Sequence, residues 1–196
     1  MRRIILFRHG KAEAAHGGDD ENRPLAPVGK GEASEAGQWM AAAGFEPDIV
    51  ICSTALRARQ TWKEAAAEFD PVPPLRYEPR VYDATVERLV EVLRELSSEV
   101  WTVLIVGHNP SLQGLVHELG AAGEPEVVER LAQGLPTAAV AVLEVEDRPW
   151  ADLGDHEGWL FAVFTPDDAE EEDIEDEADD EPAEEDDEWG WTKEDE

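Results

Sequence analysis

The chain has 196 residues and carries 47 Asp and Glu against 16 Lys and Arg, which gives a net charge of −31. This length fits one domain with an additional segment better than it fits two domains. So negative a chain excludes nucleic acid and anionic membranes as expected partners, because both bind to positively charged surfaces.

Five apolar segments predict β-strands. They are residues 4–7, 48–52, 102–106, 138–145 and 159–164. The first three are short and almost entirely apolar, which is typical of strands that are covered on both faces. The last two lie close together in the sequence, and the Gly- and Asp-rich turn between them predicts an antiparallel hairpin. Residues 75–77 form a shorter candidate strand.

Apolar side chains between these strands recur at intervals of three and four residues, which is the spacing of one helix face. The predicted helices are residues 29–43, 56–69, 86–96 and 110–119, with a shorter candidate over 126–132. Gly44 follows the first helix and Pro110 begins the fourth, at positions where these residue types commonly end and start helices. Residues 11–26 are polar and predict a surface loop.

The alternation of strands and helices predicts an α/β fold, a three-layer sandwich whose mixed, mostly parallel central sheet is flanked by helices. Ligands of such sheets bind beyond the carboxyl ends of the strands. Polar segments directly follow three of the predicted strands, and these segments are Arg8-His9-Gly10, Ser53 to Arg57, and Gly107-His108-Asn109. We therefore expect the three segments to form one shared site.

The side chains in these segments are suited to phosphoryl transfer. Arg8 and Arg57 can each bind phosphate oxygens with a planar fork of donors. A neutral His9 is a competent covalent nucleophile, and His108 can stabilise the charge that develops during transfer. Taken singly, each histidine would more often be structural, and each arginine could be a surface ion-pair residue. Their combination favours a phosphatase site.

Three segments also resemble the signatures of one enzyme family. In chain order, Leu6-Phe7-Arg8-His9-Gly10, Ser53 through Thr61 and Val106-Gly107-His108-Asn109 are similar to the three site elements of the histidine phosphatase superfamily, also called the phosphoglycerate mutase-like family. Two further segments, Asn22 to Gly29 and Leu135 to Ala138, resemble parts of its short SixA-type phosphohistidine phosphatases. The resemblance covers residues 3–165.

The resemblance implies a role for each matching residue. His9 would be the nucleophile that becomes phosphorylated. The residues that would contact the phosphoryl group or the substrate are Arg8, Arg57, His108, Arg23, Gly10 and Asn109.

Asp83 is a candidate general acid. It lies in the segment Val81-Tyr82-Asp83-Ala84, in the region where larger members of the family place a carboxylic acid. An acid that protonates a leaving group at neutral pH needs a raised pKa. The alternative interpretation is an ordinary carboxylate at the start of the following helix. The sequence leaves both open.

The length of the chain between the site elements bears on the substrate. Forty residues separate Thr61 from Thr102, where larger family members place a capping insertion that encloses small substrates. An open site favours a side chain presented by a folded partner. We therefore expect metal-independent dephosphorylation of phosphohistidine on a partner protein such as a phosphotransfer domain. The alternatives are a phosphomonoesterase acting on a small phosphorylated metabolite, and a phosphoprotein-binding module without turnover.

No cofactor and no metal ion are expected. His16, His117 and His156 have no companions at metal-ligand spacing. Cys52 is the only cysteine, so an internal disulfide is excluded. Cysteine phosphatases place five residues between their cysteine and arginine, whereas four separate Cys52 from Arg57, and the loop lacks the glycines that cradle phosphate. We therefore reject that chemistry.

The N-terminal apolar run of four residues is too short for a signal-peptide core, and no stretch approaches the length of a membrane span. These features predict a cytoplasmic protein.

Residues 1–166 are predicted to form the phosphatase domain, and residues 167–196 an acidic, disordered tail. The tail holds 20 acidic residues and one basic residue, which gives it a net charge of −19. It has too little apolar surface to offset the entropy cost of ordering. Trp189 and Trp191 are either a small docking element or two incidental aromatic residues.

Overall fold

The computed structural model describes residues 1–14 and 19–166. The predictions for the acidic tail, with Trp189 and Trp191, and for His16 concern residues outside these ranges. Among the described residues, no helix is both long enough and apolar enough to cross a membrane.

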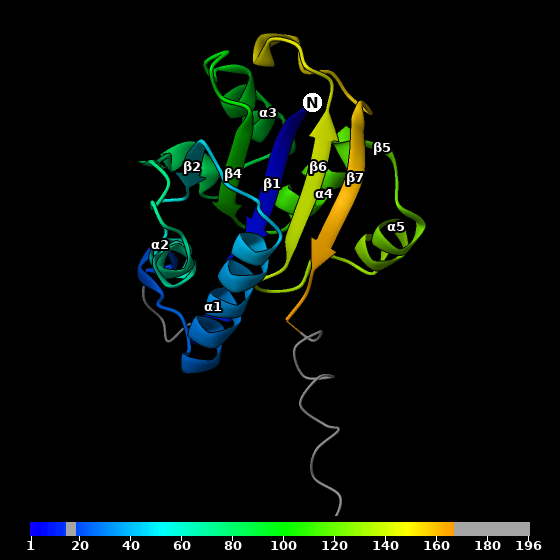
Figure 1. Ribbon diagram of the computed structural model, residues 1–196. Coiled ribbons are helices and arrows are strands. Elements are labelled where there is room, and N and C mark those ends of the chain that lie inside the picture. Colours follow the sequence, from blue (N-terminus) through cyan, green and yellow to red (C-terminus); the bar gives the residue numbers. More distant parts are fainter. Residues whose placement is uncertain (15–18, 167–196) are drawn as a thin grey trace, which may run out of the picture.

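The described residues form one seven-stranded sheet with the strand order β3-β2-β4-β1-β6-β7-β5. The strands are β1 (Arg2–Arg8), β2 (Ile49–Cys52), β3 (Leu75–Tyr77), β4 (Thr102–Gly107), β5 (Gly120–Gly123), β6 (Val140–Val145) and β7 (Gly158–Phe164). Strands β1 to β4 run parallel to one another, and β5 runs parallel to β7. β6 is antiparallel to both of its neighbours, β1 and β7. The predicted mixed sheet and its antiparallel hairpin are confirmed (Figure 1).

Helices cover both faces of this sheet. They are α1 (Pro27–Ala42), α2 (Leu56–Ala65), α3 (Val86–Arg94), α4 (Ser111–Leu119) and α5 (Pro125–Ala132), with single 3₁₀ turns η1 (Asp20–Asn22), η2 (Ala66–Glu68), η3 (Pro79–Val81) and η4 (Trp150–Asp152). Ile5 and Phe7 of β1 pack with apolar side chains of α1 and α2, whereas Ile4 and Leu6 pack with those of α3 and α4. Because successive side chains of a strand point to opposite faces, β1 contributes to both cores. The three-layer α/β sandwich is confirmed (Figure 1).

Strand β5 was not predicted. Its sequence, Gly-Ala-Ala-Gly, lacks the β-branched and aromatic residues that are typical of strands. Gly123 lies so close to β7 that a Cβ atom at this position would come within 2.4 Å of Cβ of Leu160. Small residues that allow close approach to β7, rather than β propensity, therefore explain this strand.

The helix boundaries differ from the predicted ones by a few residues. α1 begins at Pro27 and ends at Ala42, α3 ends at Arg94, and α5 begins at Pro125. α2 ends at Ala65, and the chain continues as the η2 turn through Glu68. Pro110 is the N-cap of α4 rather than its first helical residue. These differences are within about one turn, and they leave the polar segments at the predicted ends of the strands.

Candidate active site

The carboxyl ends of β1, β2 and β4 meet at one edge of the sheet, because β4 lies between the other two and runs parallel to both. Beyond these ends, the backbone N–H of His9 donates to the carbonyl of Gly107 at 3.1 Å. The backbone N–H of Ser53 donates to the carbonyl of Val106 at 3.0 Å. The structure therefore brings the three polar segments side by side.

His9 is buried and held in one tautomer. Its Nδ1 lies 2.8 Å from the carbonyl oxygen of Gly10, which can only accept a hydrogen bond, so Nδ1 carries the proton. Nε2 keeps the lone pair and accepts a hydrogen bond from Nε of Arg57 at 3.3 Å. Burial lowers the pKa of His9 to about 4, and nearby arginine charges add to this effect against the opposing Gly10 hydrogen bond. The ring is therefore neutral at pH 7.

His108 lies beside His9, with 5.0 Å between the ring centroids. Its Nε2 is 2.8 Å from Oγ of Ser53. Burial, and then the neighbouring His9 and Arg57, lowers the pKa of His108 to about 3. Nδ1 of His108 is buried and has no hydrogen-bond partner among the described residues. Both imidazoles of the site are thus neutral at pH 7.

A carboxylate occupies the fork of Arg57. Nη1 and Nη2 of Arg57 donate to the carbonyl oxygen and to Oδ2 of Asp20, at 2.7 and 3.0 Å. Arg23 binds Oδ1 of Asp20, and the hydroxyl of Tyr82 donates to Oδ2 at 3.1 Å. Burial alone would raise the pKa of Asp20, but Arg57, Tyr82 and Arg23 hold it below its ordinary value. Donors that converge on one carboxylate in this way can also bind the oxygens of phosphate.

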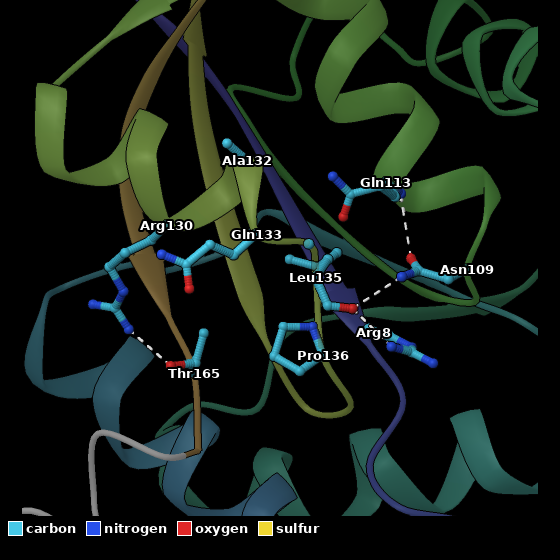
Figure 2. A pocket seen from close by; sticks show the side chains of 10 residues that line it. Arg8, Asn109, Gln113, Arg130, Ala132, Gln133, Leu135, Pro136 and Thr165 are labelled. Carbon is cyan, nitrogen blue, oxygen red and sulfur yellow. Dashed lines mark hydrogen bonds between the residues drawn. The ribbon is translucent and has the colours of Figure 1, made fainter.

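Arg8 and Asn109 share one acceptor. Nη1 of Arg8 and Nδ2 of Asn109 donate to the carbonyl oxygen of Leu135, at 2.7 and 2.9 Å (Figure 2). Burial lowers the pKa of Arg8. A cavity of about 600 Å³ opens beside these residues, with Gln113, Arg130, Gln133 and Thr165 on its further walls (Figure 2). None of the described residues that line it is Asp or Glu.

Asp83 lies in the wall of a smaller cavity, of about 110 Å³, that Arg57 and His108 also line. Its φ of 49° is a left-handed conformation that residues other than glycine rarely adopt. The N-cap of α3 is Thr85, whose side chain accepts from the backbone N–H of Arg88, so Asp83 does not cap this helix. The structure therefore places Asp83 beside the candidate site and leaves its role as an acid a prediction.

Gly10 and Arg23, which were predicted to contact the substrate, form hydrogen bonds to other residues of the protein. The N–H of Gly10 donates to Oγ1 of Thr61 at 3.0 Å. A Cβ at Gly10 would come within 2.4 Å of the carbonyl oxygen of Gly29, so a glycine is needed where this loop passes α1. Arg23 binds Asp20, as described above. Both residues therefore stabilise the loops next to Arg8, His9 and Arg57.

Four residues that contact the site were not predicted as site residues: Asp20, Ser53, Thr61 and Tyr82. Ser53 and Thr61 lie within a segment that resembles a family signature, and Tyr82 directly precedes Asp83. These segments indicated the region but not the contacts. Asp20 lies in a polar loop without a periodic pattern, and no sequence signal would have identified it.

The structure also bears on two other chemistries, a cysteine nucleophile and a bound metal ion. Burial raises the pKa of the Cys52 thiol to about 12, so Cys52 is not a thiolate at neutral pH. Within residues 1–14 and 19–166, no three His, Cys, Asp or Glu side chains are grouped so that they could hold a metal ion.

Known proteins resemble this chain in sequence and in overall fold. Residues 4–84 match the model of the histidine phosphatase superfamily (branch 1). The uncharacterized protein Rv1276c of Mycobacterium tuberculosis is 38% identical over 149 residues, which are 75% of this chain and 91% of that protein. A solved structure from Agrobacterium tumefaciens, named as a candidate phosphohistidine phosphatase SixA, is 33% identical with a TM-score of 0.65, and the match covers 74% of this chain and 92% of that chain. A structure from Nakamurella multipartitia with the same description is 30% identical with a TM-score of 0.67, over 84% and 96% of the two chains.

Proposed function

Because the chain belongs to the histidine phosphatase superfamily, we propose that it removes phosphate from phosphohistidine on a partner protein, through a phosphorylated His9 and without a metal ion. The state of His9 is the observation that carries this proposal. Its ring is neutral, its proton is on Nδ1, and its Nε2 lone pair lies beside Arg57. An imidazole in this state is the nucleophile that covalent phosphoryl transfer requires.

In the first step, the lone pair of His9 Nε2 forms a bond to phosphorus, in line with the leaving group. The bond between phosphorus and the substrate imidazole breaks, and its electron pair returns to that nitrogen, so a substrate ring that is protonated on its other nitrogen leaves as a neutral imidazole. Arg8 and Arg57 bind the oxygens of the phosphoryl group during transfer. Their guanidinium charges stabilise the transition state, which is the role that a metal ion has in other phosphatases.

In the second step, water attacks the phosphorus of phospho-His9. The bond from phosphorus to Nε2 breaks, its electrons return to Nε2, and inorganic phosphate leaves with the oxygen of the water. The Nδ1 proton, held by the Gly10 carbonyl, makes the phosphorylated ring cationic and therefore a better leaving group. The ring is neutral again when the cycle ends.

The surroundings of the site support a protein substrate. Between η2 and β4 the chain forms only the short β3, the η3 turn and α3, so this segment adds no capping domain over the strand ends. The cavity of about 600 Å³ beside Arg8 gives a partner surface room next to the phosphoryl site. The two solved structures above are named as candidate phosphohistidine phosphatases.

A phosphomonoesterase is the second candidate, and the position of Asp83 favours it. An alkoxide is a poorer leaving group than a protonated imidazole, so ester hydrolysis needs a general acid. Asp83 lines the cavity that contains Arg57 and His108, in a strained backbone conformation that the fold maintains.

Phosphate release distinguishes these functions. A phosphohistidine-bearing phosphotransfer domain is compared with a panel of small phosphate esters at matched concentrations, in buffer with a metal chelator. We expect a much larger kcat/KM for the phosphohistidine protein. The reverse ranking would support the phosphomonoesterase, and binding without release of phosphate would support a binding module. Activity that the chelator abolishes would contradict metal independence. For variants of His9, the substitution His117→Ala is the control for loss of an imidazole, because His117 is an exposed residue of α4.

A further inference from the structure

We propose that Ser53 is a positioning residue, whose hydroxyl donates to Nε2 of His108 and so keeps the His108 proton on Nδ1, as a donor to the phosphoryl group. Oγ of Ser53 lies 2.8 Å from Nε2 of His108, and both side chains are buried. The inference rests on the proposed function, but the state of His108 can be measured without any substrate.

The direction of this hydrogen bond follows from the other partner of the hydroxyl. The backbone N–H of Ala55 lies 3.3 Å from Oγ of Ser53. A backbone N–H can only donate, so Oγ is the acceptor in that contact. Within the described part of the chain, Nε2 of His108 is the acceptor that remains for the hydroxyl proton. Ser53 therefore donates, and Nε2 carries the lone pair.

A neutral imidazole with its lone pair on Nε2 has its proton on Nδ1. Nδ1 of His108 is buried and has no partner among the described residues. A buried donor without an acceptor is unfavourable, which indicates that a further group completes this hydrogen bond. The His108 ring lies 5.0 Å from the ring of His9 and lines the same small cavity as Arg57. An anionic phosphoryl oxygen bound between these groups is an acceptor of the right charge.

Loss of the Ser53 hydroxyl removes the group that selects this tautomer. The His108 proton would then distribute between the two ring nitrogens, and molecules with the proton on Nε2 could not donate from Nδ1. Because the donor acts on charge that develops during transfer, we expect kcat to fall more than KM rises.

The chain offers a matched control in Ser111. Its side chain is also buried beside His108, but its hydroxyl donates to the backbone carbonyl of His108, at 2.9 Å, and not to the ring. Ser111→Ala removes one buried hydroxyl near the same residue without touching the imidazole. Ser53→Thr keeps the hydroxyl and tests for rescue.

The test is the tautomer of His108, measured by long-range ¹H–¹⁵N NMR at pH 7 on the uniformly labelled full chain. The chain has five histidines, so the signals can be assigned with single histidine variants. We expect wild-type protein and Ser111→Ala to show an unprotonated Nε2 and a protonated Nδ1. We expect Ser53→Ala to show a mixture, or the other tautomer. Added orthovanadate, a phosphoryl analogue, should shift the Nδ1 signal in the wild-type protein.

A wild-type His108 with its proton on Nε2 would overturn the inference, whether or not the variants fold. An unchanged tautomer in folded Ser53→Ala would also overturn it. In kinetic assays we expect kcat of Ser53→Ala to fall at least about tenfold, with recovery in Ser53→Thr. Failure of the proposed function looks different: wild-type protein would show the expected tautomer and the orthovanadate shift, but no hydrolysis of phosphohistidine.

Discussion

Oδ2 of Asp20 lies 3.0 Å from Nη2 of Arg57, and the backbone carbonyl of the same aspartate lies 2.7 Å from Nη1. Arg57 is buried, whereas Asp20 is half exposed and belongs to the short η1 turn. This short turn thus places an anion on one of the two arginines that are proposed to bind the phosphoryl group. Asp20 and a phosphoryl group would compete for the same donors.

Asp20→Asn should strengthen the binding of phosphate analogues. The substitution removes a negative charge next to Arg57 but keeps a side chain that can accept hydrogen bonds. We expect the inhibition constant of orthovanadate to fall several-fold. Asp19→Asn is the control, because Asp19 carries the same charge but binds Glu21 and Asn22 rather than Arg57. Weaker inhibition of Asp20→Asn would mean that Asp20 chiefly holds Arg57 in position.

The activity should persist to lower pH than an ordinary histidine nucleophile would allow. The pKa of His9 is lowered to about 4, below its ordinary value of 6.5, so the ring stays neutral through this interval. We expect kcat/KM on a substrate without its own ionisation in this range to show no decrease assigned to His9 between pH 6.5 and pH 5. A decrease centred near pH 6.5 would show that the site does not lower the pKa of His9.

The same pKa values predict acid destabilisation. Between pH 6.5 and about 4, His9 is protonated in the unfolded chain but neutral in the folded chain. The free energy of unfolding therefore falls as the pH falls. His108, with a pKa of about 3, acts in the same direction over a wider interval. Urea denaturation at pH 7.5 and pH 4.5 should show a loss of a few kcal/mol, at about 1.4 kcal/mol per pKa unit. The double variant His9→Gln, His108→Gln should lose less, and an equal loss would assign the effect to other groups.

Asp83→Asn separates the two candidate substrates. A leaving alkoxide needs a proton from an acid, whereas a protonated imidazole leaves more readily. If Asp83 is the general acid, the substitution should lower kcat for small phosphate esters by about 10²–10⁴-fold and lower kcat for phosphohistidine much less. An equal loss for both substrates would instead indicate a structural role, which circular dichroism and thermal unfolding would detect. Unchanged kinetics would exclude Asp83 from the reaction.

Gly37 is needed where α1 crosses α2. A Cβ at this position would lie 2.7 Å from both Cα and the carbonyl oxygen of Ala65, and backbone atoms cannot move aside as a side chain can. Gly37→Ala should therefore reduce the free energy of unfolding by about 1–3 kcal/mol. Gly31→Ala is the control, because it lies in the same helix with no atom within 4 Å of the added Cβ. That variant should gain about 0.5–1 kcal/mol, and equal effects would contradict the packing argument.

The sequence predicts the fold and the location of the site because both depend on local patterns. Continuous apolar runs identified β1, β2 and β4, and polar residues directly after them identified one edge of the sheet. The tautomer of His9 could not be predicted, since it depends on the distance between Nδ1 and the carbonyl oxygen of the next residue. The fork of Arg57 is filled by Asp20, a residue 37 positions earlier, and this pairing depends on how η1 packs against α2. Strand β5 was missed because its formation depends on close packing against β7.

The central claim is that His9 accepts the phosphoryl group. We would mix the protein with a phosphohistidine-bearing phosphotransfer domain, quench the reaction at alkaline pH within milliseconds, and locate the phosphate by mass spectrometry. The account predicts one acid-labile phosphate on His9, formed before inorganic phosphate is released, and none in His9→Gln. The account would be contradicted if His9→Gln released inorganic phosphate at the wild-type rate and neither the wild-type enzyme nor the variant carried a phosphorylated histidine.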